Sequence, residues 1–268
     1  MAALVALAAA APAAPAAAQK TQDEARLMFT VGLTYTGGSD LWAVSGQPIL
    51  HAPPGVGSDT VDLSRAIGGA PGLVFSGMYF PKPALGLVGE AYFMGIGLKD
   101  QCQPASPLPT ERTQEICNSI DGASSRSSAV LLSVGGVARI GGNQPISPYA
   151  RAQVGLLFSN LSPIAMSGAT VVTDSLGNSE ILSAVIYEDP STTRVTPAFV
   201  LGGGFTAALG KGWQLRTEVR DNIVEIATVA GPTRAGNTNP EIVNQWKNLF
   251  SIMIGVDVVL EKKRGHRY

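Results

Sequence analysis

The sequence predicts an all-β protein, an eight-stranded antiparallel up-and-down transmembrane β-barrel with short periplasmic turns and four long extracellular loops. Three observations predict this fold: apolar and polar residues alternate along several segments, charge is scarce, and short connections alternate with long ones. Only 15% of the 268 residues are charged, whereas a typical soluble domain has about 25%. Beyond the N-terminus no run of about 18 apolar residues occurs, so no transmembrane helix is expected.

Residues 213–222 show the alternation most clearly, because successive side chains of a strand point to opposite faces. One face carries Trp213, Leu215, Thr217 and Val219, and the other carries Gln214, Arg216, Glu218, Arg220 and Asn222. Residues 148–159 repeat the pattern, with Arg151 and Gln153 opposite Val154 and Leu156. One face of each strand suits hydrocarbon and the other is polar, as in the wall of a membrane barrel.

Eight segments are predicted as strands, all alternating except the second, whose facing is ambiguous. In chain order they are residues 27–36, 72–80, 85–98, 128–140, 148–159, 195–208, 213–222 and 248–260. In the other alternating segments Phe29 opposes Thr30, Phe93 opposes Glu90, Val134 opposes Arg139, Phe199 opposes Thr196, and Ile252 opposes Asp257.

Turns are expected at 81–84, 141–147 and 209–212, and long loops at 37–71, 99–127, 160–194 and 223–247. Such asymmetry is typical of outer-membrane barrels, and an even number of strands leaves both ends of the barrel on the turn side, in the periplasm. In the third loop, residues 168–173 and 180–187 flank a turn-like SLGN. They form either a hairpin that extends the neighbouring strands or a loose polar loop.

The polar strand faces are predicted to point into the barrel, since Arg or Lys facing lipid costs about 2–4 kcal/mol at the bilayer midplane. Eight strands enclose a lumen that side chains just fill. The predicted lumen network comprises Glu90, Arg139, Arg151, Gln153, Gln214, Arg216, Glu218 and Arg220. It closes the lumen and holds the barrel together, or else lines a gated narrow conduit. Strand glycines are expected to leave room for large inward side chains.

Aromatic residues near strand ends predict rings at the two membrane interfaces, or ordinary core filling. They are Phe29, Tyr35, Phe80, Tyr149, Phe158 and Trp213. The N-terminal residues 1–18 read as a signal peptide that ends in Ala16-Ala17-Ala18, a typical cleavage site. The barrel would then occupy 19–268, with strands over about 27–260 and a basic tail at 261–268.

Cys102 and Cys117 lie in one polar, Pro-rich stretch, which favours a loop disulfide in an exported protein, with two free thiols as the alternative. The only histidines, His51 and His266, lie in a loop and in the tail. Neither has the partners that a catalytic triad or a metal site needs. We therefore expect no enzyme activity, no metal and no cofactor. The net charge of −1 gives no reason to expect nucleic-acid binding.

With eight strands, alternating connections and a charged lumen face, the chain resembles the small OmpA-type outer-membrane barrels, which include OmpX-like and OmpW-like proteins. The resemblance covers about residues 25–260 and rests on pattern, since no diagnostic motif is present. It implies a bacterial outer-membrane protein of the cell envelope, monomeric, in contact with lipid, lipopolysaccharide and the assembly machinery. One departure concerns the end of the chain: Tyr268 is a terminal aromatic, as is common in these barrels, but the segment EKKRGHRY is basic and does not alternate. Either the last strand ends at Leu260 and a periplasmic tail follows, or the assembly signal is internal.

Three functions fit these features. The first is a structural or surface-binding barrel with a plugged, porin-like lumen, whose loops meet an unknown extracellular ligand. The second is a narrow conduit for small hydrophobic molecules, which an empty hydrophobic lumen would favour but against which the charged inward faces argue. The third is a soluble exported, lipocalin-like binding barrel, because the same alternation with inside and outside exchanged also makes a soluble barrel.

Overall fold

The computed structural model describes residues 26–38, 40–49, 59–121, 124–141, 144–160, 162–173, 177–189, 194–210, 212–233 and 239–261. Only the backbone is described for 124–127 and 261. The predicted signal peptide, both histidines and the tail after Glu261 lie outside these residues. No helix in the described part of the chain is long and apolar enough to cross a membrane.

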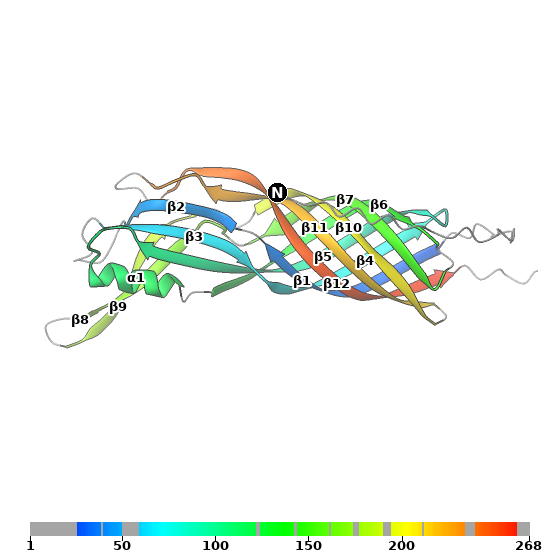
Figure 1. Ribbon diagram of the computed structural model, residues 1–268, viewed down its shortest axis with the longest axis horizontal. Helices are drawn as coiled ribbons and strands as arrows, with labels where there is room; N and C mark the ends of the chain where they lie inside the picture. Colours follow the sequence, from blue (N-terminus) through cyan, green and yellow to red (C-terminus); the bar gives the residue numbers. More distant parts are fainter. Residues whose placement is uncertain are drawn as a thin grey trace, which may run out of the picture.

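Eight antiparallel strands close into a ring, and their order around the ring follows the chain (Figure 1). They are β1 (Arg26–Gly38), β4 (Ala70–Phe80), β5 (Leu85–Pro104), β6 (Ser124–Arg139), β7 (Ile146–Ser159), β10 (Arg194–Gly210), β11 (Trp213–Val229) and β12 (Ile242–Glu261). Pairing of β12 with β1 closes the ring, from Arg26 opposite Glu261 to Gly38 opposite Leu249. The predicted up-and-down barrel is confirmed.

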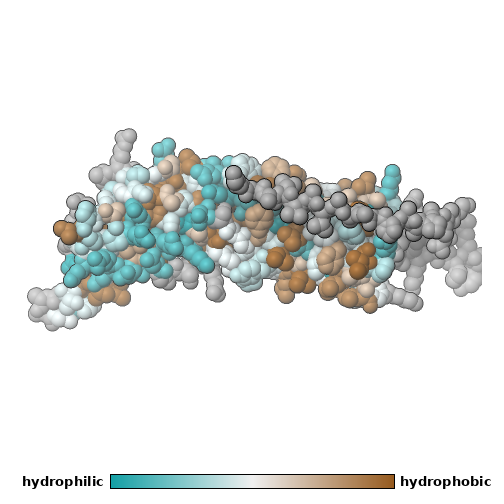
Figure 2. All heavy atoms as spheres, in the orientation of Figure 1, coloured by the Kyte–Doolittle hydropathy of each residue, from teal (hydrophilic) through white to brown (hydrophobic). Residues whose placement is uncertain are grey.

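The barrel is apolar outside and polar inside. Val31 and Val219 are 52% and 60% exposed, whereas Arg216 and Arg220 are 2% and 1% exposed. Figure 2 shows hydrophilic residues concentrated on the extension half of the visible face, while hydrophobic residues are more frequent over the barrel half. Charges inside and a hydrocarbon-like belt outside exclude the soluble, lipocalin-like alternative, in which the two faces would be exchanged.

The four long connections lie where the sequence predicts them, and they carry regular structure that was foreseen only as one alternative for the third. They contain β2 (Asp40–Pro48), β3 (Thr60–Gly68), helix α1 (Glu111–Asp121), β8 (Met166–Thr173) and β9 (Ser179–Tyr187). β2 and β3 add to the sheet beside the outer part of β5, while β11 and β12 also extend beyond the predicted strands. These elements form an extracellular extension at the end of the barrel opposite the short turns (Figure 1).

The hairpin alternative for the third connection is correct, but β8 and β9 form a separate two-stranded sheet and do not extend β7 and β10. The hairpin packs on α1, where the Ala169 N–H donates to the Ser119 hydroxyl at 2.7 Å and Thr170 hydrogen-bonds Glu115. The predicted disulfide is confirmed, and Cys102–Cys117 ties α1 to β5. The helix therefore links the hairpin to the barrel wall.

Candidate functional site

Four charged side chains meet inside the barrel, from strands β5, β7 and β11. Arg151 lies 2.7 Å from Glu90 and 2.8 Å from Glu218, measured between guanidinium nitrogen and carboxylate oxygen. Arg220 lies 2.8 Å from Glu90 and 3.1 Å from Glu218. Each guanidinium thus contacts both carboxylates, and all four side chains are 0% exposed. We call this closed, electrically neutral group the ion-pair ring.

The strand register explains how these side chains fit into a narrow lumen. Gly202 of β10 lies opposite Arg151 on one side and Arg220 on the other. A Cβ atom at this position would lie only 2.6 Å from Oε1 of Glu218. Gly202 therefore leaves space for the ring, as expected for strand glycines. Because separating any of these ion pairs would leave an uncompensated buried charge, the four groups are held in one arrangement.

A second ion pair lies one layer closer to the periplasm. The Arg216 guanidinium donates to Asp257 at 2.9 Å, and Thr30 donates to the same carboxylate at 2.7 Å. Asp257 is fully buried. Asp257 is not among the predicted network residues, although it lies in phase with Ser251 on the polar face of β12. That phase was the signal that could have identified it.

The other predicted network residues are inward but lie apart from these pairs. Arg139 is buried at the periplasmic end, donates to the Pro83 carbonyl at 2.8 Å, and forms no ion pair with the residues that the structure describes. Gln153 is buried one step beyond Arg151 along β7, and Gln214 is half-buried opposite Asp257. The structure thus divides the predicted network into a ring, a pair and single polar residues.

Two predicted interface aromatics face the lumen instead. Phe80 and Tyr149 are buried, and their rings lie under guanidinium groups: Arg139 is 4.1 Å from the Phe80 centroid and Arg216 is 4.8 Å from that of Tyr149. The Tyr149 hydroxyl also donates to Glu218 at 2.6 Å. Their proximity to strand ends was misleading, because both residues fall on the inward phase of their strands. They offset the cost of burying cations through cation–π contact.

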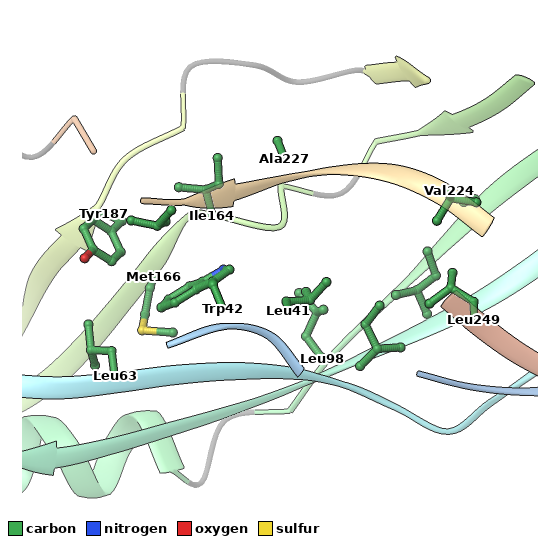
Figure 3. Packing of buried hydrophobic residues seen from close by; sticks show 14 of the residues in the cluster. Leu41, Trp42, Leu63, Leu98, Ile164, Met166, Tyr187, Val224, Ala227 and Leu249 are labelled. Carbon is green, nitrogen blue, oxygen red and sulfur yellow. The ribbon is translucent and has the colours of Figure 1, made fainter. Parts of the chain in front are cut away.

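The lumen changes from charged to apolar on the extracellular side of the ring. Its wall there carries the buried side chains of Tyr92, Met94, Leu131, Leu157, Val200 and Leu249. This layer continues into the extension, where Trp42, Ile164, Met166 and Tyr187 gather at one end of the cluster while Val224 and Leu249 lie at the other (Figure 3). The prediction of a lumen closed by charge did not anticipate this apolar chamber.

The barrel wall splits beside the apolar chamber. Pairing of β10 with β11 ends at Ala198 opposite Val224, after which β10 continues along β7 and β11 continues along β12. Pro197, which has no N–H to donate, lies at the start of the split. A cavity of about 50 Å³ lies here. Its apolar lining includes Leu41, Ile67, Ile96, Leu98, Leu157 and Ala227, and Arg194, Thr196 and Glu225 line it from the split strands.

Side-chain hydrogen bonds join the extracellular connections to one another within the extension. The Trp42 indole N–H donates to the Pro163 carbonyl at 2.9 Å. The Tyr187 hydroxyl donates to Oε1 of Gln47 at 2.9 Å, and this oxygen also accepts the Thr233 N–H at 2.8 Å. Burial raises the pKa of the Tyr187 phenol above its ordinary value, so that it remains a neutral donor. The first, third and fourth connections are thereby held together.

A closed antiparallel ring with an apolar outer belt satisfies every requirement of a structure that crosses a bilayer with strands. Its polar lumen, short turns and structured outer extension are those of a small β-barrel of the bacterial outer membrane. The chain is an outer-membrane β-barrel protein.

No protein-family model matches the chain, and no curated protein matches it in sequence. Among solved structures it is similar to the outer membrane protein OprG from Pseudomonas aeruginosa, with 9% identity, a TM-score of 0.46, and coverage of 90% of this chain and 98% of OprG. It is also similar to the outer membrane protein AlkL, with 16% identity, a TM-score of 0.41, and coverage of 96% and 99%. Neisserial surface protein A is similar too, with 11% identity, a TM-score of 0.39, and coverage of 87% of this chain and 96% of that protein.

Proposed function

We propose that this barrel binds small uncharged apolar molecules in its extracellular half and releases them sideways into the outer leaflet. The ion-pair ring closes the route to the periplasm. One observation carries this proposal: an apolar cavity lies between two strands of the wall that have separated from each other, on the extracellular side of a neutral, fully buried ring.

The ring supports a closed lumen. A solute that crossed this level would have to separate Arg151 and Arg220 from their carboxylates, and an unpaired buried charge costs several kcal/mol. The Arg216–Asp257 pair presents the same obstacle one layer further in. An apolar molecule cannot replace either partner. The lumen therefore serves as a plug, and the exit for an apolar ligand is the split between β10 and β11.

The cavity itself supports a ligand without charge. Its volume of about 50 Å³ compares with about 10–15 Å³ needed for one water-sized group, so several such groups fit. Its wall is apolar apart from Ser159, Arg194, Thr196 and Glu225. An alkyl chain would bury its surface there at about 25 cal/mol per Å². A charged molecule would lose its hydration against a mainly apolar wall, whose charged residues Arg194 and Glu225 lie only at the split.

Quenching of Trp42 fluorescence by 1-bromooctane tests the proposal, because Trp42 bonds to a residue of the cavity wall. The barrel is placed in nanodiscs with Trp213→Phe and Trp246→Phe, so that Trp42 is the single reporter. We expect saturable quenching, and we expect its loss when Ala227→Leu fills the cavity. Equal, non-saturating quenching in both proteins would refute the binding site. A steady ion current across a planar bilayer would refute the plug.

A surface-binding role is the second candidate, and the β8–β9 hairpin favours it. Val171 and Ile181 are opposite each other on this hairpin and are 52% and 73% exposed, beyond the membrane belt. An exposed apolar pair at this place suits contact with an apolar surface. Phenyl-substituted beads should retain cells that display the protein on their surface. Such retention, and its loss in Ile181→Asp, would support this role. Unchanged retention in the variant would exclude the hairpin as the contact.

A further inference from the structure

Two hollows lie on either side of one short segment of the extracellular extension, residues 162–165, which we call the partition segment. The first hollow is the lateral cavity already described, and Pro163 lines it. The second is an open hollow of about 470 Å³, and Ala165 lines it together with Tyr187, Glu188 and Asp189. The partition segment is therefore the wall between an outer vestibule and the lateral cavity.

The partition segment carries an apolar residue into the core without belonging to any strand. Ile164 is fully buried among Trp42, Met166 and Tyr187 (Figure 3). Residues 162–165 form no ladder with the barrel or with the β8–β9 hairpin. The segment can therefore be displaced without breaking any strand pairing of the wall. A segment without the backbone hydrogen bonds of strand pairing opens at a lower free energy than the surrounding sheet.

A chain of polar contacts holds the segment in place. The Ser162 hydroxyl oxygen accepts the N–H groups of Ile164 at 3.1 Å and Ala165 at 2.8 Å, and the hydroxyl donates to Asp189 at 2.5 Å. Nη2 of Arg194 then donates to both oxygens of Asp189 at 2.9 Å. Arg194 lies on β10 at the edge of the split. The chain of contacts thus fastens the partition segment to the rim of the lateral opening.

We propose that the partition segment is a gate between the outer vestibule and the lateral cavity, and that the Arg194–Asp189 ion pair latches it closed. This inference rests on the proposed function, because it describes how an apolar ligand reaches the cavity. Glu188 and Asp189 at the vestibule disfavour anions, and the mainly apolar lining of the cavity behind it favours uncharged molecules over cations. The hydrogen bond from the Trp42 indole to the Pro163 carbonyl is a second contact that holds the segment, and it defines the closed position of the gate.

Stopped-flow quenching of Trp42 by 1-bromooctane, in the same nanodisc protein, separates the gate from the cavity. Asp189→Asn and Arg194→Gln each remove one charge of the latch. We expect either variant to raise both the association and the release rate about tenfold, equivalent to a 1.4 kcal/mol change in the gate equilibrium. In Asp189→Asn the dissociation constant is expected to change much less, because that variant leaves the cavity lining unchanged. Arg194 itself lines the cavity, so only the rates are compared for Arg194→Gln.

Three controls make the outcome specific. Glu188→Gln removes the same charge from the same vestibule but lies outside the latch, so its rates are expected to equal those of the parent. The exchange Asp189→Arg with Arg194→Asp restores an ion pair and is expected to return the rates towards the parent values. Retention of the heat-dependent gel shift shows that each variant is a folded barrel, and Ser162→Ala replaces any variant that fails this check.

The outcomes distinguish the gate from the proposed function. Faster exchange in both latch variants, parent rates in Glu188→Gln and restored rates in the exchanged pair would support the gate. Saturable binding with unchanged rates in the latch variants, or equal acceleration in Glu188→Gln, would overturn the gate and leave the cavity intact. An absence of saturable binding in the parent protein would overturn the proposed function, and the gate with it.

Discussion

The two halves of strand β5 place opposite chemistry on the same faces. In the barrel its outward residues include Leu87 and Phe93, and its inward residues include Glu90. In the extension the outward positions become Lys99 and Gln101, while Leu98 and Cys102 point inward. The phase of the strand does not change between the halves. The solvent does: hydrocarbon surrounds the first half and water surrounds the second.

Strand β11 changes in the same way and marks the same boundary. Arg220 is buried within the ring, whereas Val224, four residues later, is buried in the apolar chamber. Outside, Val219 faces lipid, but Asp221 accepts a hydrogen bond from Asn248 at 2.6 Å. The protein thus joins a membrane barrel to a water-soluble sheet without interrupting its strands. Outward residues are apolar where lipid surrounds the strands and polar where water does, and the lateral cavity lies at the boundary between these two regions.

The largest difference between the halves is expected when one carboxylate of the ring is removed. Glu218→Ala leaves Arg151 and Arg220 short of a partner inside the barrel, so we expect the free energy of unfolding to fall by about 3–5 kcal/mol. Urea unfolding in lipid vesicles, followed by the gel shift, measures this loss. The neighbouring outward variant Val219→Ala is expected to lose less than about 1 kcal/mol, since lipid contacts that position in any case. Equal losses would contradict a ring whose pairing matters.

A second comparison places the same new charge outside each half. Val31 lies midway along β1 and faces lipid, so Val31→Arg is expected to destabilise the barrel by about 2–4 kcal/mol. Gln103 faces water on the outer part of β5, so Gln103→Arg is expected to stay within about 0.5 kcal/mol of the parent. The same vesicle unfolding assay measures both. A costly Gln103→Arg would move the membrane boundary beyond the extension.

A third comparison tests the space around the ring with two adjacent glycines. Gly202 faces the ring, and a Cβ there would lie 2.6 Å from Glu218, so Gly202→Ala is expected to cost about 1–3 kcal/mol by overpacking. Gly203 faces outward, and the nearest atom to its Cβ would be the Tyr149 carbonyl oxygen at 3.7 Å. Gly203→Ala should therefore leave stability nearly unchanged. If both variants behave alike, the ring adapts to the added methyl group.

Alternation was sufficient to predict the ring of strands because one face of each strand must meet lipid, and that requirement is written at every second residue. The inward positions of Arg151, Glu218 and Arg220 followed directly. The ion pairs between these residues could not be predicted from the alternation, because they depend on which strands face each other across the lumen. Asp257 was omitted although its phase was correct. Phe80 and Tyr149 were assigned to the interfaces from their place near strand ends, although Tyr149 shares the polar phase of Arg151.

The extension was less predictable because its elements depend on one another. Helix α1 has eleven residues, and a helix of that length is marginal by itself. It is held by the Cys102–Cys117 bridge, by the hairpin and by contacts at its N-terminus. Val61 and Leu63 alternate with Asp62 in β3, as expected for a strand, but this short pattern lies within a segment that was predicted as a long loop. The wall split also escaped prediction, because it results from register and not from composition.

The smallest expected difference between the halves is their response to low pH. It concerns the carboxylate of Asp59 in the extension. This carboxylate accepts the Thr110 N–H at 2.9 Å and the Thr113 hydroxyl at 2.6 Å, where α1 begins. The Thr110 backbone bond, followed by the Thr113 hydroxyl, holds the pKa of Asp59 below its ordinary value of 3.8. A lowered pKa means that the stabilisation is present above the ordinary value and is lost as the pH falls through the folded-state value.

Titration of the Thr110 and Thr113 amide NMR signals in nanodiscs, from about pH 5 to about pH 2, measures this local transition. We expect a midpoint below 3.8 in the parent protein, with the signals of Gly202, beside the buried ring, remaining in place. Asp59→Asn should abolish the transition at α1, because the amide cannot titrate. A midpoint at or above 3.8 would mean that these hydrogen bonds do not favour the carboxylate. Simultaneous movement of Gly202 would mean that acid acts on both halves, and that the extension does not respond independently of the barrel.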